Sequence, residues 1–214
     1  MANPGQDGYD SAAVRRVYQG MAADYSDRFG ADLACPDSDT AFLDAALADL
    51  PDGPVLDVGC GPAQVSRYLL GLRRLPIGVD FAPDMLAAAA RLVPQASLVA
   101  ADLLDLPFRP ASCAGAVASY SLHHLPGARL DAALAGLRAA LRPRGVLVVI
   151  THGGSGEERL GQYDGNVVLC RHSAADLAAR LARIGLEIEL ASERPPRPGE
   201  FPADKVRVSA RAPA

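Results

Sequence analysis

The stretch that most constrains the fold of this chain is VLDVGCGPA, from Val55 to Ala63. An apolar run ends on an acidic residue and then breaks into glycines, a pattern typical of a buried parallel strand followed by a loop that a nucleotide-like ligand can approach. Gly59 and Gly61 lack a Cβ, so the backbone can turn sharply there and place its N–H groups against a ligand. The stretch therefore predicts an α/β sheet with a cofactor at this loop.

A second acidic residue follows the glycines at the sequence spacing expected for a carboxylate that binds a ribose. The segment LPIGVDFAPDML ends its apolar run at Asp80, and a carboxylate about 20 residues beyond the glycines can accept from both hydroxyls of a ribose. A glycine turn that binds nothing is the alternative. A nicotinamide dinucleotide is disfavoured, because the third glycine of the G-x-G-x-x-G fingerprint falls on Gln64, whose side chain obstructs the pyrophosphate.

Five segments between Val55 and His152 resemble, in order, the class I, Rossmann-like, S-adenosylmethionine-dependent methyltransferases. DVGCGPA is similar to the family's D-x-G-C-G-P-G, with Ala63 in place of the third glycine, and GVDFAPDML is similar to G-x-D-x-S-x-x-M-L. VAADLLDLPF resembles G-D-x-x-x-L-P-F, and AVASYSLHHL resembles a strand that ends in two histidines. LRPRGVLVVITH resembles the L-R-P-G-G turn, with Arg144 in place of a glycine. The resemblance implies S-adenosylmethionine as methyl donor, S-adenosylhomocysteine as product and a small-molecule acceptor.

The order of apolar runs and helical periodicity predicts a doubly wound α/β sheet with helices on both faces. Helices are expected at residues 14–29, 39–50, 63–72, 83–92, 129–141 and 174–184. Strands are expected at residues 55–58, 76–79, 97–100, 113–119, 145–151, 186–191 and 205–210. The resemblance implies a mostly parallel, seven-stranded Rossmann-like sheet whose last strand is antiparallel and follows a hairpin at residues 192–204.

The length of 214 residues and a hydrophobic content of 50% fit a single domain, 1–214. We expect an N-terminal helical cover at 1–50, a cofactor-binding core at 54–152, and an acceptor-side segment with the terminal strands at 153–214. Residues 151–172 are rich in glycine and poorly periodic, and a mobile surface loop is their simplest interpretation.

The net charge and the hydropathy of the sequence limit the kinds of molecule that this protein is expected to bind. The formal net charge is −4 and the sequence has no basic run, which argues against a nucleic-acid substrate. No apolar run reaches the ~18 to 20 residues of a membrane span, and the first residues lack an apolar signal core. The four cysteines have no C-x-x-C spacing. We therefore expect a cytoplasmic monomer or homodimer with free thiols, no metal site and a small-molecule acceptor.

The resemblance implies roles at the methionine end of the cofactor. Asp57 would accept from the ammonium group, and the backbone of Gly59 and Gly61 would border the same part. Ser119 lies at the carboxyl end of its strand, where open α/β sheets bind ligands, and its backbone would also reach the ammonium.

The adenosine end has its own expected residues. Asp80 would hold the ribose, and Phe81 and Met85 would pack on the adenine faces, although ordinary core packing explains Met85 equally well. Asp102 would accept from the adenine amino group, while the backbone of Leu103 meets the ring nitrogen.

The N-terminal segment VYQGMAADYSDRF is similar to a Y-D-x-x-A-x-x-Y-D element that covers the cofactor in many family members. Tyr25 matches its second tyrosine and is expected to line the site, whereas Tyr18 is a weaker candidate. The alternative is an amphipathic helix whose tyrosine reaches water.

Two histidines are candidates for catalysis. Methyl transfer from a sulfonium needs alignment rather than a nucleophile, but an oxygen or nitrogen acceptor can require a base. His124 and His152 follow two neighbouring strands and suit that task, with packing of the cofactor region as the alternative for His124. A non-catalytic S-adenosylmethionine-binding protein and, less favoured, a nicotinamide-dependent oxidoreductase remain alternatives for the whole chain.

Overall fold

The computed structural model describes residues 9–29, 37–161, 167–198 and 200–214. Within these ranges the helices are α1 (Ser11–Phe29), α2 (Asp37–Ala46), α3 (Gln64–Gly71), α4 (Pro83–Leu92), α5 (Gly127–Ala140) and α6 (Ala174–Arg183). The strands are β1 (Pro54–Val58), β2 (Leu75–Asp80), β3 (Ser97–Ala100), β4 (Cys113–Ser119), β5 (Leu141–His152), β6 (Gly156–Arg159), β7 (Val168–Arg171), β8 (Glu187–Arg194) and β9 (Lys205–Arg211).

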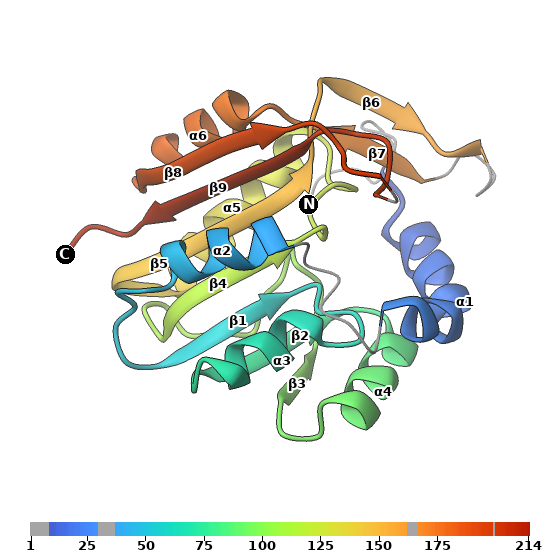
Figure 1. Cartoon of the computed structure of the whole chain (residues 1–214), viewed down its shortest axis with the longest axis horizontal. Coiled ribbons are helices and arrows are strands. Elements are labelled where there is room, and N and C mark those ends of the chain that lie inside the picture. Colours follow the sequence, from blue (N-terminus) through green and yellow to red (C-terminus); the bar gives the residue numbers. More distant parts are fainter. Residues whose placement is uncertain (1–8, 30–36, 162–166, 199) are drawn as a thin grey trace.

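Seven strands form one sheet in the order β3-β2-β1-β4-β5-β9-β8 (Figure 1). The pairs from β3 to β5 are all parallel, and β9 is antiparallel to both β5 and β8. Neighbouring parallel strands must be joined by crossover connections, which here contain helices. Because the strand order reverses at β1, these helices cover both faces of the sheet. The predicted doubly wound sheet with an antiparallel last strand is confirmed.

Alternating side chains of the central strands enter two different cores, because successive residues of a strand point to opposite faces. Leu56 and Val58 of β1 pack in the cluster that contains α5 and α6, whereas Val55 packs in the cluster that contains α2 and α3. A smaller apolar cluster around Ala63 and Ala89 joins α4 to the start of α3. Burial on both faces explains why the strands read as continuous apolar runs rather than alternating ones.

The main departure from expectation lies in residues 151–172. Instead of a surface loop, the segment contains a two-stranded antiparallel sheet, β6–β7, with Gly156 opposite Arg171 and Arg159 opposite Val168. All four residues of β6 are exposed, while three of the four in β7 are buried, so neither strand alternates. Because buried and exposed residues do not alternate in either strand, the sequence pattern did not predict them.

Two boundaries also differ from those expected. β5 begins at Leu141 rather than residue 145, and Arg144 takes a left-handed conformation there, with φ of 61°. Its N–H donates to the carbonyl of Ala212, so the end of the chain pairs with this extension. α2 ends at Ala46, four residues early, and the apolar Leu50 is buried outside the helix.

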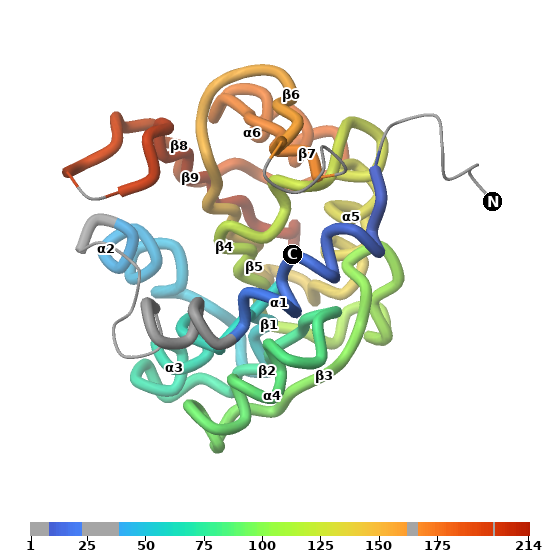
Figure 2. The backbone as a smooth tube through the Cα atoms, turned by 90° about the vertical axis from the view of Figure 1, so that its right-hand side faces the viewer, coloured from blue at the N-terminus to red at the C-terminus, as the bar shows by residue number. Residues whose placement is uncertain are grey.

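The carboxyl ends of β1, β2, β4 and β5 meet at one edge of the sheet. Figure 2 looks onto this edge, which α1 crosses while the β6–β7 hairpin lies to one side. Asp10 caps α1, because its Oδ1 accepts from the N–H groups of Ala12 at 2.9 Å and Ala13 at 3.0 Å. Ala22 of the same helix packs against Met85 of α4. No helix in the described ranges is long and apolar enough to cross a membrane.

Candidate cofactor and acceptor site

The glycine loop after β1 turns through left-handed backbone conformations. Gly59 has φ of 66°, and a Cβ there would lie 2.4 Å from the Cβ of Ser121, so only glycine fits. Ala63, which replaces the family's third glycine, also has φ of 66° and caps α3. The substitution therefore keeps the left-handed turn at a cost in backbone strain.

Asp57, at the end of β1, is a buried carboxylate. Its Oδ2 accepts from the N–H of Ser66 at 2.8 Å and from the Ser66 hydroxyl at 2.7 Å, at the start of α3. Burial raises the pKa of Asp57 to about 7 despite these two bonds, and the charge of Asp80 adds to the rise. In the described part of the chain no cationic side chain pairs with this carboxylate.

Asp80, at the end of β2, connects two loops. Its Oδ2 accepts from the Gly61 N–H at 2.9 Å, and its Oδ1 accepts from the Ala82 N–H at 2.9 Å. Burial raises the pKa of Asp80, while these backbone N–H groups act in the opposite direction. Each carboxylate oxygen has a second lone pair, so Asp80 can still accept from a ligand's hydroxyl groups.

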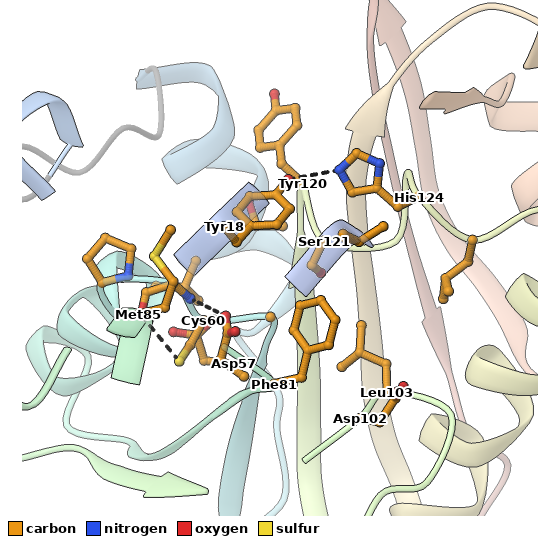
Figure 3. Close-up of a pocket in the computed structure, with 18 of the residues that line it drawn as sticks. Tyr18, Asp57, Cys60, Phe81, Met85, Asp102, Leu103, Tyr120, Ser121 and His124 are labelled. Atoms are coloured by element: carbon orange, nitrogen blue, oxygen red, sulfur yellow. Dashed lines mark hydrogen bonds between the residues drawn. The ribbon is translucent and has the colours of Figure 1, made fainter. Parts of the chain in front are cut away.

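A cavity at this edge brings most of the predicted site residues together (Figure 3). Its lining includes every residue that we expected to bind the cofactor except Tyr25: Asp57, Gly59, Gly61, Asp80, Phe81, Met85, Asp102, Leu103 and Ser119. His124 lines it as well, whereas His152 does not. The side chain of Tyr25 lies outside the described residues.

The residues expected at the adenine all form part of the cavity wall. Met85 is buried against Phe81 and α1, so its position fits both core packing and contact with a ligand. Asp102 uses its Oδ1 to accept from the Leu104 N–H at 2.9 Å, which fixes the loop after β3. Tyr9 joins this wall, and burial, with the charge of Asp102, raises its pKa to about 12.

His124 and Tyr18 both line the cavity and contact each other (Figure 3). His124 Nδ1 lies 2.6 Å from the carbonyl oxygen of Val168 in β7, and since a carbonyl only accepts, Nδ1 carries the proton. Burial lowers the pKa of His124, so the ring is neutral at pH 7 and its Nε2 is an acceptor. The Tyr18 hydroxyl, 2.9 Å from Nε2, donates to it. A main-chain group thus sets the tautomer.

The other two histidines lie beside this pair. The rings of His123 and His124 are 4.2 Å apart, and those of His123 and His152 are 5.4 Å apart. Burial, with the neighbouring imidazoles, holds the pKa of His123 well below its usual range. His152 packs against the ring of Tyr120, with centroids 5.0 Å apart, so Tyr120 rather than His152 faces the cavity.

Sequence analysis missed several residues of the lining. No sequence motif assigns a role to Tyr9, Tyr120 or Ser121, and the N-terminal motif favours Tyr25 over Tyr18, yet Tyr18 lines the cavity with these three residues. Tyr120 was discoverable, because it directly follows the strand that ends at Ser119 and therefore lies at the ligand edge. No sequence pattern around Tyr9 indicates a site residue, because Tyr9 reaches the cavity only through the packing of α1.

The residues of the cavity fit S-adenosylmethionine. The donor set offers two buried carboxylates for an ammonium and a ribose, a flat apolar wall for adenine and a further carboxylate at Asp102. The loop at Gly61 leaves open space, since a Cβ there would approach nothing closer than the Met85 sulfur at 4.0 Å. Within the described ranges no group of three His, Cys, Asp or Glu could hold a metal ion, and Cys60, Cys113 and Cys170 are buried free thiols.

Known sequences show related domains. Residues 55–145 match a family model described as a methyltransferase domain. An uncharacterized methyltransferase of Synechocystis sp. is 33% identical over 104 residues, which cover 49% of each chain. The dTDP-3-amino-3,6-dideoxy-alpha-D-glucopyranose N,N-dimethyltransferase of Streptomyces fradiae is 36% identical over 134 residues, 62% of this chain and 49% of the relative. The chain thus spans about half the length of these curated relatives.

Solved structures share the whole fold. The 1,6-didemethyltoxoflavin-N1-methyltransferase of Burkholderia thailandensis, with bound 1,6-didemethyltoxoflavin and S-adenosylhomocysteine, superposes with a TM-score of 0.78 at 22% identity, covering 100% of this chain and 92% of that one. A phosphoethanolamine N-methyltransferase of Haemonchus contortus, in complex with phosphomonomethylethanolamine and S-adenosylhomocysteine, gives a TM-score of 0.76 at 15% identity, covering 94% and 59%.

Proposed function

We propose that this chain is a class I S-adenosylmethionine-dependent methyltransferase and that it transfers a methyl group from S-adenosylmethionine to a nitrogen, oxygen or carbon atom of a small-molecule acceptor. Relatives that act on an amino sugar nucleotide and on 1,6-didemethyltoxoflavin support a small acceptor. The net charge of −4 agrees with an acceptor other than nucleic acid.

One observation carries the proposal: Asp57 and Asp80 are buried side by side at the glycine loop, with no cationic partner in the described part of the chain. Burying an ionised carboxylate is costly unless a positive group or hydrogen-bond donors compensate it. A ligand that carries an ammonium and a ribose diol supplies both. S-adenosylmethionine also supplies a methyl group already activated on a sulfonium when it is bound.

The cofactor-binding residues divide between the two ends of the ligand. We assign Asp57, with the backbone of Gly59, Gly61 and Ser119, to the methionine part. Asp80 would hold the ribose, and the adenine would lie between the residues on the remaining wall: Phe81, Met85, Asp102, Leu103 and Tyr9. Tyr25, on the same helix as Tyr18, stays a proposed cover residue.

His124 would act as the general base through Tyr18. The Tyr18 hydroxyl proton points at Nε2, so proton transfer to His124 leaves the Tyr18 oxygen able to take a proton from the acceptor. The carbonyl of Val168 stabilises the imidazolium that forms, because it accepts from Nδ1–H. His152 would support this pair through the packing of His123 and Tyr120 rather than touch the acceptor.

The test has two parts. Isothermal titration with S-adenosylmethionine, S-adenosylhomocysteine and NADH should show binding of the first two and none of NADH; the reverse pattern would favour an oxidoreductase. Incubation with S-adenosylmethionine and a panel of small amines, phenols and carboxylic acids should then release S-adenosylhomocysteine only when an acceptor is present. Tight cofactor binding without turnover on any acceptor would favour a non-catalytic binding protein.

A further inference from the structure

Lys205 is the sequence's only lysine, and it is almost completely buried at 3% exposure. It starts β9 opposite His152, the last residue of β5, which places it at the carboxyl edge where the cavity lies. Its Nζ donates to the carbonyl oxygen of Phe201 at 3.1 Å. The same atom lies 5.7 Å from the ring centroid of Tyr120 and 5.8 Å from that of Phe201. An ammonium has three protons to donate, and here one of them meets an oxygen.

Three carboxylates act on the charge of Lys205: Glu200 and Asp39 pair with arginines, and the third, Asp204, is exposed. Glu200 forms two hydrogen bonds of 2.7 Å with the guanidinium of Arg194. Asp39, which is fully buried, lies 3.5 Å from Arg207. Throughout the described residues no carboxylate comes within ion-pair distance of the Lys205 ammonium. The chain therefore buries a cation whose neighbouring carboxylates lie beyond ion-pair distance, an arrangement that costs free energy which a ligand's negative charge in direct contact would recover.

Three aromatic rings form a wall beside this ammonium. The ring of His152 lies between those of Tyr120, at 5.0 Å, and Phe201, at 4.6 Å. Tyr120 lines the cavity, and Phe201 is an apolar ring left 48% exposed. In Figure 3 the Tyr120 side chain lies at the end of the cavity away from Asp57. Such a wall can pack against the flat face of an aromatic ligand.

The surroundings of His152 are positive. Its pKa falls to about 4, first because the ring is buried and then because of the positive charges of Lys205 and Arg171. The Nε of Arg171 and the Nδ1 of His152 are buried with no hydrogen-bond partner in the described structure. Arg171 pairs with Glu158, so Lys205 is the cation of this group without an ion pair in the described structure, and unpartnered polar atoms lie beside it, next to the cavity but away from the expected cofactor residues.

We propose that the rings of Tyr120 and Phe201, held in place by the His152 ring packed between them, bind the methyl acceptor, and that Lys205 selects an acceptor which is flat and carries a carboxylate. The carboxylate would accept from the two ammonium protons that have no oxygen partner, while the flat body packs on the rings. The inference rests on the proposed methyltransferase function, because it assigns the cofactor to the Asp57 side and leaves this wall to the acceptor.

The single lysine allows a direct test. Protein labelled with ¹³C at lysine Cε gives one lysine side-chain signal, which can be followed in the presence of saturating S-adenosylhomocysteine. Matched probes would be titrated: benzoate with benzamide, 4-hydroxybenzoate with 4-hydroxybenzamide, and trans-cinnamate with cinnamamide. We expect at least one acid, and none of the amides, to shift the signal saturably. If no acid shifts it, or if an amide shifts it as much as its acid, the proposal is overturned.

Variants separate a binding role from a structural one. Lys205→Met should keep its melting temperature and its affinity for S-adenosylhomocysteine, and weaken the acid by about tenfold or more, the loss expected for a charged hydrogen bond. Arg197→Met removes an exposed positive charge from the preceding loop and should change neither affinity. A Lys205→Met protein that binds the acid normally, or that loses its fold, would contradict the proposal. Failure of wild-type protein to bind S-adenosylhomocysteine would instead contradict the proposed function.

Discussion

The side of the cavity built from β1 and β2 and the region beside the cavity that β5, β7 and β9 form, here called the second side, differ in how their polar groups are satisfied. On the first side, backbone N–H groups bind both carboxylates: Ser66 reaches Asp57, while Gly61 and Ala82 reach Asp80. On the second side, the buried side-chain atoms without a described hydrogen-bond partner are numerous: His123 Nδ1, His152 Nδ1, Thr151 Oγ1 and Arg171 Nε.

This difference indicates two kinds of recognition. A carboxylate fixed by backbone N–H groups is held in one orientation, so the cofactor side is organised before its ligand binds. A buried polar atom without a partner costs about 1 to 3 kcal/mol, and a ligand that supplies the partner recovers that free energy. If the acceptor binds on the second side, as we propose, this side would discriminate among acceptors, because an acceptor that lacks the matching group leaves the cost in place.

We expect the largest effect from His124→Ala. His124 lies between the two sides, because it lines the cavity and contacts Val168 of β7. Loss of a general base should lower turnover by about 10² to 10⁴-fold, with partial recovery at high pH as the acceptor ionises by itself. Affinity for S-adenosylhomocysteine should change little, because the cofactor residues remain. Steady-state kinetics at pH 6 to 10, with titration calorimetry, measure both quantities.

Two variants serve as controls for His124. Tyr18→Phe removes the hydroxyl that bonds Nε2 and should reproduce most of the loss, whereas His152→Ala should affect kcat by less than about tenfold, since its ring does not line the cavity. A loss in His124→Ala below about tenfold, without recovery at high pH, would leave His124 a packing role only.

Asp80→Ala should be next in size. Each charged hydrogen bond lost to the ribose costs about 1.5 to 3 kcal/mol of binding free energy, which weakens S-adenosylhomocysteine by tenfold or more. The free energy of unfolding should fall as well, because the Gly61 and Ala82 N–H groups lose their acceptor. The control is Asp84→Ala, an exposed acid in the first turn of α4. Unchanged affinity in a folded Asp80→Ala protein would remove Asp80 from the site.

The pKa of Asp57 predicts a smaller, pH-dependent effect. An ammonium binds the ionised carboxylate, so with a pKa of about 7 the affinity for S-adenosylhomocysteine should weaken about tenfold from pH 8 to pH 6. Without ligand, the free energy of unfolding depends on pH in the opposite direction. Between about pH 4 and pH 7 the carboxyl of Asp57 keeps its proton in the folded protein, whereas the unfolded chain has already lost it. Stability should therefore fall as the pH rises from about 4 to 7. Asp57→Asn should flatten both profiles, and a pH-independent wild-type affinity would contradict the assignment.

The smallest effect concerns a position far from both sides of the cavity. Arg144 has φ of 61°, where glycine costs less than other residues by about 1 kcal/mol. Arg144→Gly should raise the free energy of unfolding by about that amount in urea denaturation and leave both ligand affinities unchanged. Arg109→Gly, an exposed loop residue outside the left-handed region, is the matched control and should give no gain. Equal effects of the two changes would argue against local strain at Arg144.

The same two sides differ in how well their residues could be predicted from the sequence. Asp57, Gly59 and Asp80 were predictable because strand, turn and helix signals lie within a few residues of each other, and a parallel sheet places strand ends at one edge. The proposed acceptor site around Tyr120, Phe201 and Lys205 was not predictable in this way. Lys205 and Tyr120 are 85 positions apart in the sequence, and they meet because β9 inserts beside β5, which no local pattern records. The β6–β7 hairpin was missed for a different reason, since its strands do not alternate.

The bond between His124 Nδ1 and Val168 has a consequence for how this protein could diversify. The acceptor of that bond is a main-chain oxygen, which every amino acid possesses. Any substitution at position 168 that preserves the strand leaves the imidazole in the same tautomer. Changes of side chain at position 168 are therefore limited by packing of the buried strand and not by the need to orient the imidazole.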